Sequence, residues 1–348
     1  MDLTTVADDL IVVHDGTTVH RREGLAPGTE HVVAGLPART LDRPGGDLLC
    51  RFATVNDVHF GEIECGRIDD HREGPIQRAA PGEPPYPETM NAGAIAEMAA
   101  ADLAAVVVKG DLTTDGQPGE LAAFERTYVG AFGDRLYVVR GNHDAYQGQD
   151  VWSGDRWIEL PGVAIALVDT VLPTRTTGWI SPQQLDWLDT LAATAEVPVL
   201  VMGHHQQWIP GAGGAERRSD DYFGLHPDAS DALAEVIERR PSIVAYTAGH
   251  THRHRVRRTA AGVPSIEVGC VKDFPGTWAE YRVFEGGILQ VVHRISSPAA
   301  LAWSERCRHL YSDFGVDYEH YALGTLADRC FPIALRAPHA AAARRTEP

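Results

Sequence analysis

Short apolar runs alternate with amphipathic segments along most of the chain. The segments with helical spacing of apolar positions lie at 89–103, 119–132, 181–194 and 227–241, and Ser181 followed by Pro182 predicts a capped helix start. This alternation predicts an α/β fold with helices layered on sheets. The apolar runs are typical of buried strands and lie at 47–55, 104–109, 135–140, 162–168, 197–202 and 242–258.

The two ends of the chain differ from this alternating region. Residues 1–49 contain short strand-like runs, two of them joined at Asp15-Gly16, and predict a small β appendage. We expect one catalytic domain over 50–298, with a late hairpin that turns at Gly286-Gly287. The tail, 299–348, is amphipathic and predicts helices that pack back on the domain, a homodimer contact being the alternative.

Composition narrows the class of protein. The formal net charge of −17 argues against stable binding to nucleic acid, which depends on phosphate neutralisation. No stretch approaches the ~20 apolar residues that a membrane span needs, and the acidic start "MDLTTVADDL" does not resemble a signal peptide, so we expect a cytoplasmic protein with no membrane partner. The five cysteines include no C-x-x-C pair and predict reduced thiols.

Polar clusters end five of the apolar runs, and ligand sites in α/β folds lie at strand ends. Carboxylate, amide and imidazole groups without a thiolate suit divalent ions such as Mn²⁺, Fe²⁺, Zn²⁺ or Ni²⁺. Two ions that share one carboxylate would need about seven protein ligands. If the local chain is extended, the i, i+2 pairs Asp57/His59 and His250/His252 each point to one side. The clustered residues are Asp57, His59, Asp111, Asn142, His143, His204, His205, His250 and His252.

The segments "NDVHFG", "KGDLT", "RGNHDAY", "MGHHQ" and "AGHTHR" resemble the five ordered motifs of the calcineurin-like metallophosphoesterases. The resemblance spans about residues 50–295 and is greatest for the branch of bacterial cyclic-nucleotide phosphodiesterases and glycerophosphodiesterases. It implies a four-layer α/β/β/α sandwich of two mixed sheets flanked by helices. It also implies that metal-bound hydroxide attacks a small phosphodiester, such as a cyclic nucleotide.

The resemblance implies a role for each matching residue. Asp57, His59 and His252 would hold one metal, Asn142, His204 and His250 the second, and Asp111 would bridge them. His143 would donate a proton to the leaving group, with Asp144 as its carboxylate partner. Since "GHHQQW" lacks the usual proline, either His204 or His205 could be the ligand; motif position favours His204 and leaves His205 a substrate-binding or supporting role.

Several alternatives stay open from the sequence. No tyrosine follows Asp111 in "LTTDG", which disfavours the purple acid phosphatases and favours a pair of Mn²⁺, Fe²⁺ or Zn²⁺ ions. A phosphomonoesterase or nucleotidase is the second enzymatic reading. A non-catalytic metal-binding scaffold is the third hypothesis. The intact Asn142-His143-Asp144 argues against it. We expect His254 and the basic run of Arg253, Arg255, Arg257 and Arg258 to lie in solvent at the rim.

Overall fold

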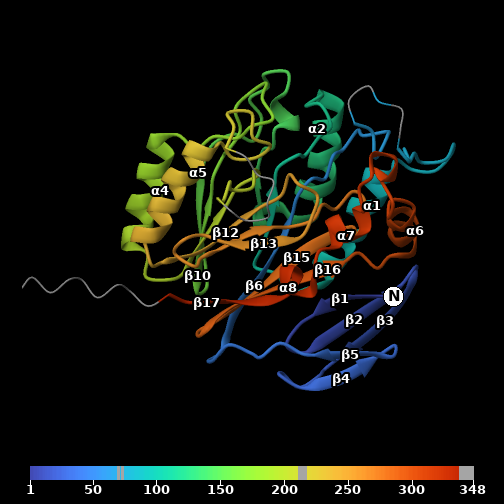
Figure 1. Ribbon diagram of the computed structural model, residues 1–348, viewed down its shortest axis with the longest axis horizontal. Coiled ribbons are helices and arrows are strands. Elements are labelled where there is room, and N and C mark those ends of the chain that lie inside the picture. Colours follow the sequence, from blue (N-terminus) through green and yellow to red (C-terminus); the bar gives the residue numbers. More distant parts are fainter. Residues whose placement is uncertain (69–70, 72–73, 211–217, 337–348) are drawn as a thin grey trace, which may run out of the picture.

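Two large mixed sheets lie face to face in the computed structural model, which describes residues 1–68, 71, 74–210 and 218–336 (Figure 1). In the described residues, one six-stranded sheet has the order β17-β16-β15-β6-β7-β8. Strands β6, β7 and β8 are parallel, whereas β15, β16 and β17 run antiparallel to their neighbours. Its strands are β6 (Leu48–Val55), β7 (Ala105–Lys109), β8 (Leu136–Val139), β15 (Thr277–Phe284), β16 (Gly287–Arg294) and β17 (Phe331–Ala334).

The other six-stranded sheet of the described chain has the order β13-β14-β12-β11-β10-β9. Strands β10, β11, β12 and β14 are parallel and the edge strands β9 and β13 are antiparallel. The strands are β9 (Arg156–Leu160), β10 (Val163–Leu167), β11 (Val199–Met202), β12 (Ile243–Ala248), β13 (Arg255–Arg258) and β14 (Pro264–Glu267).

Helices cover the outer face of each sheet. Helices α4 (Pro182–Thr194) and α5 (Pro227–Arg239) pack on the β9–β14 sheet; α1 (Tyr86–Ala100), α2 (Pro118–Phe124) and α6 (Pro298–Arg306) pack on the other. The core between the sheets contains Phe52, Val107, Ile165, Leu200 and Tyr281. The four-layer α/β/β/α fold is therefore confirmed.

Local sequence signals explain where these elements begin. At the start of α4, Ser181 Oγ accepts a hydrogen bond from the backbone N–H of Gln184 at 3.2 Å, and the Gln184 side chain accepts from Ser181 N–H at 2.9 Å. The chain after α2 continues through one π-helical turn, Glu125–Val129, into the short α3 (Gly130–Phe132). Strands β15 and β16 form the predicted late hairpin.

The N-terminal appendage consists of two small sheets. Strands β1 (Asp2–Val6), β2 (Leu10–Asp15) and β3 (Thr18–Glu23) form one, and the predicted β2–β3 hairpin turns at Gly16-Thr17, one residue after the Asp15-Gly16 signal begins. Strands β4 (Glu30–Val33) and β5 (Leu36–Arg39) form the other. Val6, Ile11 and Val13 pack against Leu289 and Val291 of β16, so the appendage rests on the sheet that contains β16.

The C-terminal tail is only partly the helical segment that we predicted. It contains α6, α7 (Tyr318–Leu323) and α8 (Leu326–Arg329), but Phe331–Ala334 forms the edge strand β17 beside β16. Residues 337–348 of the tail lie outside the described part. The predicted single strand over 242–258 is also wrong, because the chain leaves β12 after Ala248, turns, and returns in β13.

Candidate metal centre

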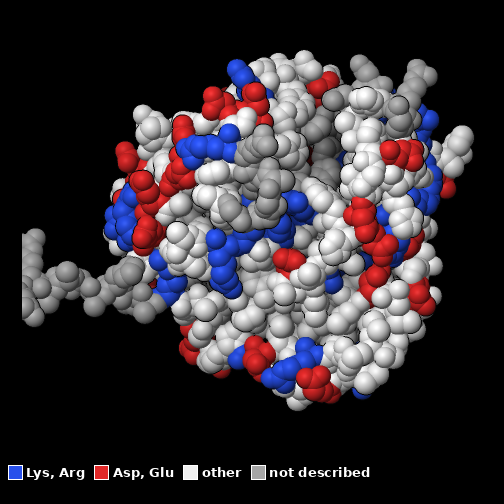
Figure 2. All heavy atoms as spheres, viewed as in Figure 1, with Lys and Arg blue, Asp and Glu red and all other residues white. Residues whose placement is uncertain are grey.

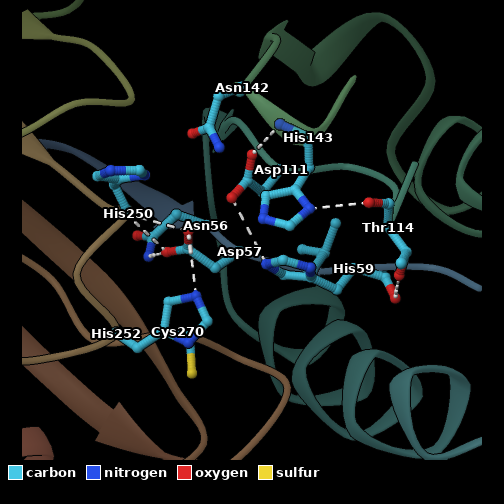
Figure 3. A network of polar contacts seen from close by, with 12 residues as sticks. Asn56, Asp57, His59, Asp111, Thr114, Asn142, His143, His250, His252 and Cys270 are labelled. Carbon is cyan, nitrogen blue, oxygen red and sulfur yellow. Dashed lines mark hydrogen bonds and ion pairs between the residues drawn. The ribbon is translucent and has the colours of Figure 1, made fainter. Parts of the chain in front are cut away.

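One group of candidate ligand atoms comes from the end of β6 and the loop after β12. A carboxylate oxygen of Asp57 and ring nitrogens of His59 and His252 all lie within 4.8 Å of one another (Figure 3). His252 Nε2 is 3.7 Å from Asp57 Oδ1. The backbone N–H of His250 donates to both Asp57 oxygens, at 3.0 and 3.1 Å, and thereby joins the two segments.

A second group comes from the ends of β7, β8, β11 and β12. His204 Nε2 is 3.3 Å from Asp111 Oδ1, 3.0 Å from Asn142 Oδ1 and 3.2 Å from His250 Nδ1. All these residues are at most 5% exposed. The structure therefore brings together the four residues that the resemblance assigns to the second metal.

Asp111 lies between the two groups. Its Oδ2 is 3.5 Å from His59 Nε2 (Figure 3). Its Oδ1 is 3.3 Å from His204 Nε2. Burial opposes ionisation of this carboxyl, but His204 and His143 hold its pKa well below the usual range. A carboxylate with one oxygen toward each group has the geometry that a bridging ligand needs.

Polar contacts outside the ligand set orient three of the ligands. His204 Nδ1 donates to the carbonyl of Lys109 at 2.9 Å, so Nε2 is the ring nitrogen that faces Asp111 and can bind a metal. The Asn142 amide nitrogen donates to Tyr146 Oη at 2.6 Å, so its oxygen faces His204. His252 Nδ1 is 3.5 Å from Asp273 Oδ2.

Strained backbone marks the same residues. Nine described residues other than glycine have positive φ, and five of them are Asp57, His59, Asp111, His250 and His252, at φ 54°, 48°, 50°, 70° and 53°. Such conformations cluster at functional sites. The i, i+2 pairs are therefore not extended, contrary to our assumption. At Gly249, a Cβ would lie 2.7 Å from Asp57 Oδ2, so this close approach requires glycine.

The residues present fit a pair of divalent cations. Both ring nitrogens of His59 and Nε2 of His250 are buried and make no hydrogen bond within the described chain, which is costly without a further partner. Burial lowers the pKa of both imidazoles, with Lys272 adding to the effect at His59 and His205 at His250, so both are neutral and able to ligate. Burial opposes a proton on His204, yet Asp111 raises its pKa to about 9; a cation between them would replace that proton.

His143 stands beside this centre, but its partner is not the one that we expected. Its Nδ1 donates to the carbonyl of Thr114 at 2.8 Å (Figure 3). The Asp144 carboxylate instead accepts from the backbone N–H groups of Leu112, Thr113 and Gly141 at 2.7–3.0 Å. Asp144 therefore joins two ligand loops rather than orienting His143. Its pKa is raised to about 6 by burial and by the nearby Asp111.

His205, for which we predicted a substrate-binding or supporting role, is fully buried and does not line the cavity over the metal centre. Its Nδ1 is 2.8 Å from Thr170 Oγ1, and its ring lies edge-on to His204 with centroids 4.9 Å apart. His204, not His205, faces Asp111 and Asn142. His205 supports the ligand rings from behind.

The expected solvent positions at 253–258 are wrong for His254 and Arg257, which are buried, whereas Arg253 and Arg255 are partly exposed. His254 is 2% exposed, and Gly269 N–H donates to its Nδ1 at 3.2 Å. The side chains of Arg253, Arg255 and Arg257 converge on the buried Glu267 at 2.9, 2.7 and 3.3 Å. Period-two reasoning failed because the loop at 249–254 is not extended.

A cavity of about 840 Å³ opens over the two ligand groups. Its lining includes the candidate ligands, His143, Lys272 and an aromatic set that sequence reasoning missed: Phe223, Tyr311, Tyr318 and Tyr321. The buried pair Lys272-Asp273 was missed too, although two charges inside the apolar run "VGCVKDF" are a usable signal. Figure 2 shows basic side chains over the β13 region of this face, with acidic groups toward its edges.

The sequence matches the family described as "Calcineurin-like phosphoesterase" over residues 50–254, more than half of the chain. The chain belongs to this family. The expected family and the expected enzyme class, a metallophosphoesterase, are thus confirmed, and the family implies two divalent metal ions at the site described above.

Curated relatives are similar over the same region. A "Probable cyclic nucleotide phosphodiesterase" of Synechococcus sp. is 30% identical over 156 residues, 42% of this chain and 57% of the relative. A "cAMP/cGMP dual specificity phosphodiesterase" of Mycobacterium tuberculosis is 27% identical over 172 residues, 46% and 52% of the two chains. The alignments thus span only a little over half the length of these relatives.

A solved structure, a dimetal phosphatase from Danio rerio, shares the fold with a TM-score of 0.54 at 16% identity, covering 72% of this chain and 98% of that one. Across the described residues, every helix falls short of the length and apolarity that crossing a bilayer demands.

Proposed function

We propose that this chain is a binuclear metal-dependent phosphodiesterase that hydrolyses small phosphodiesters, with cyclic nucleotides as the first candidates. The position of Asp111 carries the proposal: its two carboxylate oxygens lie 3.5 Å from His59 Nε2 and 3.3 Å from His204 Nε2 beneath the cavity. One carboxylate shared by two nitrogen-rich groups is the arrangement that two-metal phosphoesterase chemistry requires.

The ligand sets follow from the two groups of atoms. Asp57, His59 and His252 would hold the first ion; Asn142, His204 and His250 would hold the second, and Asp111 would contact both. An Mn²⁺, Fe²⁺ or Zn²⁺ pair suits this oxygen and nitrogen set. When bound, the ions would make a nucleophile from water near neutral pH and neutralise charge on the phosphoryl oxygens.

His143 would move the proton. Because a carbonyl only accepts, the bond from Nδ1 to Thr114 keeps the proton on Nδ1 and leaves Nε2 to deliver a proton when the ring is protonated. The backbone N–H of His143 donates to Asp111 Oδ1 at 3.1 Å, which fixes the residue beside the centre. His143 would thus protonate the leaving oxygen of the ester.

The cavity supports a small substrate. A volume of about 840 Å³ lies in the range of small-molecule sites. Phe223 stacks on the His250 ring with centroids 4.1 Å apart yet is 52% exposed, so it offers an aromatic surface beside the metals. Such surfaces stack on bases, and the names of the curated relatives refer to cyclic nucleotides.

The test compares diester and monoester substrates on the purified protein with Mn²⁺. We expect faster cleavage of bis(p-nitrophenyl) phosphate than of p-nitrophenyl phosphate, and of 3′,5′-cyclic AMP than of 5′-AMP. The reverse preference in both substrate pairs would show that the chain is a phosphomonoesterase or nucleotidase and not a diesterase. If Mn²⁺, Fe²⁺ and Zn²⁺ all bind but none supports turnover, the chain is a non-catalytic scaffold.

A further inference from the structure

The buried carboxylate of Asp273 lies behind the first metal site. Asp273 is 0% exposed, and its Oδ2 is 3.5 Å from His252 Nδ1, on the side of the ring opposite the metal site. Its Oδ1 accepts from the hydroxyl of Tyr318 at 2.8 Å and from Cys270 Sγ at 3.0 Å. Two donors therefore hold Oδ1, whereas Oδ2 faces the candidate ligand with Cys65 Sγ at 3.8 Å and Lys272 Nζ at 4.0 Å beside it.

His252 is the ligand that most needs such support. Its side chain is 16% exposed at the cavity, whereas the other candidate ligands are almost fully buried. Its backbone has a φ of 53°, so the local chain does not restrict the ring as a regular element would. An acceptor at Nδ1 keeps the proton there, directs Nε2 toward Asp57 and raises the basicity of Nε2.

The donor Tyr318 comes from the C-terminal tail. It is the first residue of α7, and it is 2% exposed because its ring packs against Tyr311 and Tyr321, with centroids 5.1 and 6.0 Å away. Tyr321 makes a second link, since its hydroxyl donates at 3.0 Å to the carbonyl of Thr251, between His250 and His252. The tail thus touches the ligand loop and the residue behind it.

We propose that Asp273 is the positioning residue for His252 and that Tyr318 holds Asp273 in place, which makes the C-terminal tail a part of the first metal site. The inference rests on the ligand role of His252 in the proposed function. It predicts that loss of a hydroxyl in the tail weakens one metal site and spares the other, although Tyr318 itself binds no metal.

Mn²⁺ binding to chelator-treated protein tests the proposal without any substrate. Free Mn²⁺ would be followed by electron paramagnetic resonance for wild type, Asp273→Asn, Tyr318→Phe and the double variant. Tyr281→Phe is the matched control, because it also removes a buried hydroxyl, whose partners are Gln290 Oε1 at 2.9 Å and Thr247 Oγ1 at 3.4 Å, neither of them a candidate ligand. The unfolding midpoint of each metal-free variant is measured as well. If a variant keeps the wild-type midpoint, its loss of Mn²⁺ affinity reflects lost positioning and not lost folding.

We expect Asp273→Asn to weaken one of two Mn²⁺ sites by about 10–100-fold, the usual effect of losing such a partner, and to leave the other unchanged. Tyr318→Phe should weaken the same site by roughly fivefold, as the loss of one hydrogen bond predicts, and should add little in the Asp273→Asn background. If Asp273→Asn does not fold, the Mn²⁺ affinity of Tyr318→Phe alone tests the proposal.

Three results would overturn the inference while the proposed function stands, and the first two come from the Mn²⁺ titrations. One is wild-type Mn²⁺ affinity at both sites in both variants; the other is equal weakening in Tyr281→Phe. A third Zn²⁺ per chain that disappears in Cys270→Ser would also overturn it, since Cys270, Asp273 and His252 offer atoms within 4.8 Å and Asp273 would then be a ligand. Wild type that binds no divalent metal would refute the proposed function as well.

Discussion

Glu267 is the residue whose change tests most directly how the ligand loop is held. It is 1% exposed, and its carboxylate accepts from Thr251 Oγ1 at 2.9 Å, between His250 and His252 in the chain. It is also the shared counter-charge of Arg253, Arg255 and Arg257. Burial alone would raise its pKa, but the three guanidinium groups, Arg253 first, lower it below the usual range.

Glu267→Gln keeps the shape and removes the charge. Arg257 is 5% exposed at its side chain and loses a buried counter-charge, an event that usually costs about 3–5 kcal/mol. Arg253 and Arg255 are about one-fifth exposed and contribute less. We therefore expect the free energy of unfolding to fall by about 3 kcal/mol, a large part of the 5–15 kcal/mol typical of a folded domain. Mn²⁺ affinity should fall too, because the hydrogen bond that holds Thr251 loses its charged acceptor.

Urea unfolding of the metal-free protein and Mn²⁺ binding are the two assays. Glu30→Gln is the control, since Glu30 is an exposed strand carboxylate whose change should stay within about 0.5 kcal/mol. If Glu267→Gln unfolds at the same urea concentration as Glu30→Gln, the buried ion cluster does not stabilise the loop. Unchanged Mn²⁺ affinity in a clearly destabilised variant would refute the link from Glu267 to the ligands.

Three further predictions concern the centre and the pH response. Asp111→Asn should abolish hydrolysis and remove at least one Mn²⁺, counted on the purified variant; two retained ions would contradict the bridging role. His143→Gln should retain both metals and slow cyclic AMP hydrolysis by about 10²–10⁴-fold, but slow bis(p-nitrophenyl) phosphate much less, because p-nitrophenolate leaves without a proton; equal losses would argue against proton donation. His14 has its pKa lowered to about 3, mainly by burial and then by Arg294. Below pH 6.5 the imidazole of His14 is protonated in the unfolded chain, whereas in the folded chain it stays neutral down to about pH 3. The free energy of unfolding therefore falls as the pH falls from 6.5 to 3. From pH 7 to pH 5, wild type should lose about 2 kcal/mol more than His14→Gln in urea unfolding, and parallel pH profiles would contradict this.

The fold was predictable because its central strands are buried on both faces. Strands β7, β10 and β11 are buried at every position and appear in the sequence as plain apolar runs. Strand β17 has no such signal: it is four residues long, contains Pro332 and lies at an edge, where proline is tolerated. Only its pairing with β16 identifies it as a strand.

The ligand residues were predictable for a different reason, which is that they follow directly after buried strands. Their supporting residues were not, because each acts across a long separation in sequence. Asp273 contacts Tyr318 of the tail, and the carbonyl of Thr114 holds His143. His254 was misplaced because the positive φ of His252 breaks the alternation from which its side was inferred.

Buried carboxylates outside the ligand set share one physical task in this centre. Five candidate ligands in the left-handed region together cost on the order of 5 kcal/mol or more, a sum comparable to the stability of a whole domain. Asp144 joins the loops of Asp111 and Asn142 through backbone N–H groups, Glu267 anchors Thr251, and Asp273 faces His252. Because each is buried and accepts several hydrogen bonds, each offsets strain that the metal ligands impose. Removal of the charge at Glu267 or Asp273, whose pKa values are lowered by their partners, should therefore lower stability and metal affinity together, whereas charge removal at Asp111 should act chiefly on the metals.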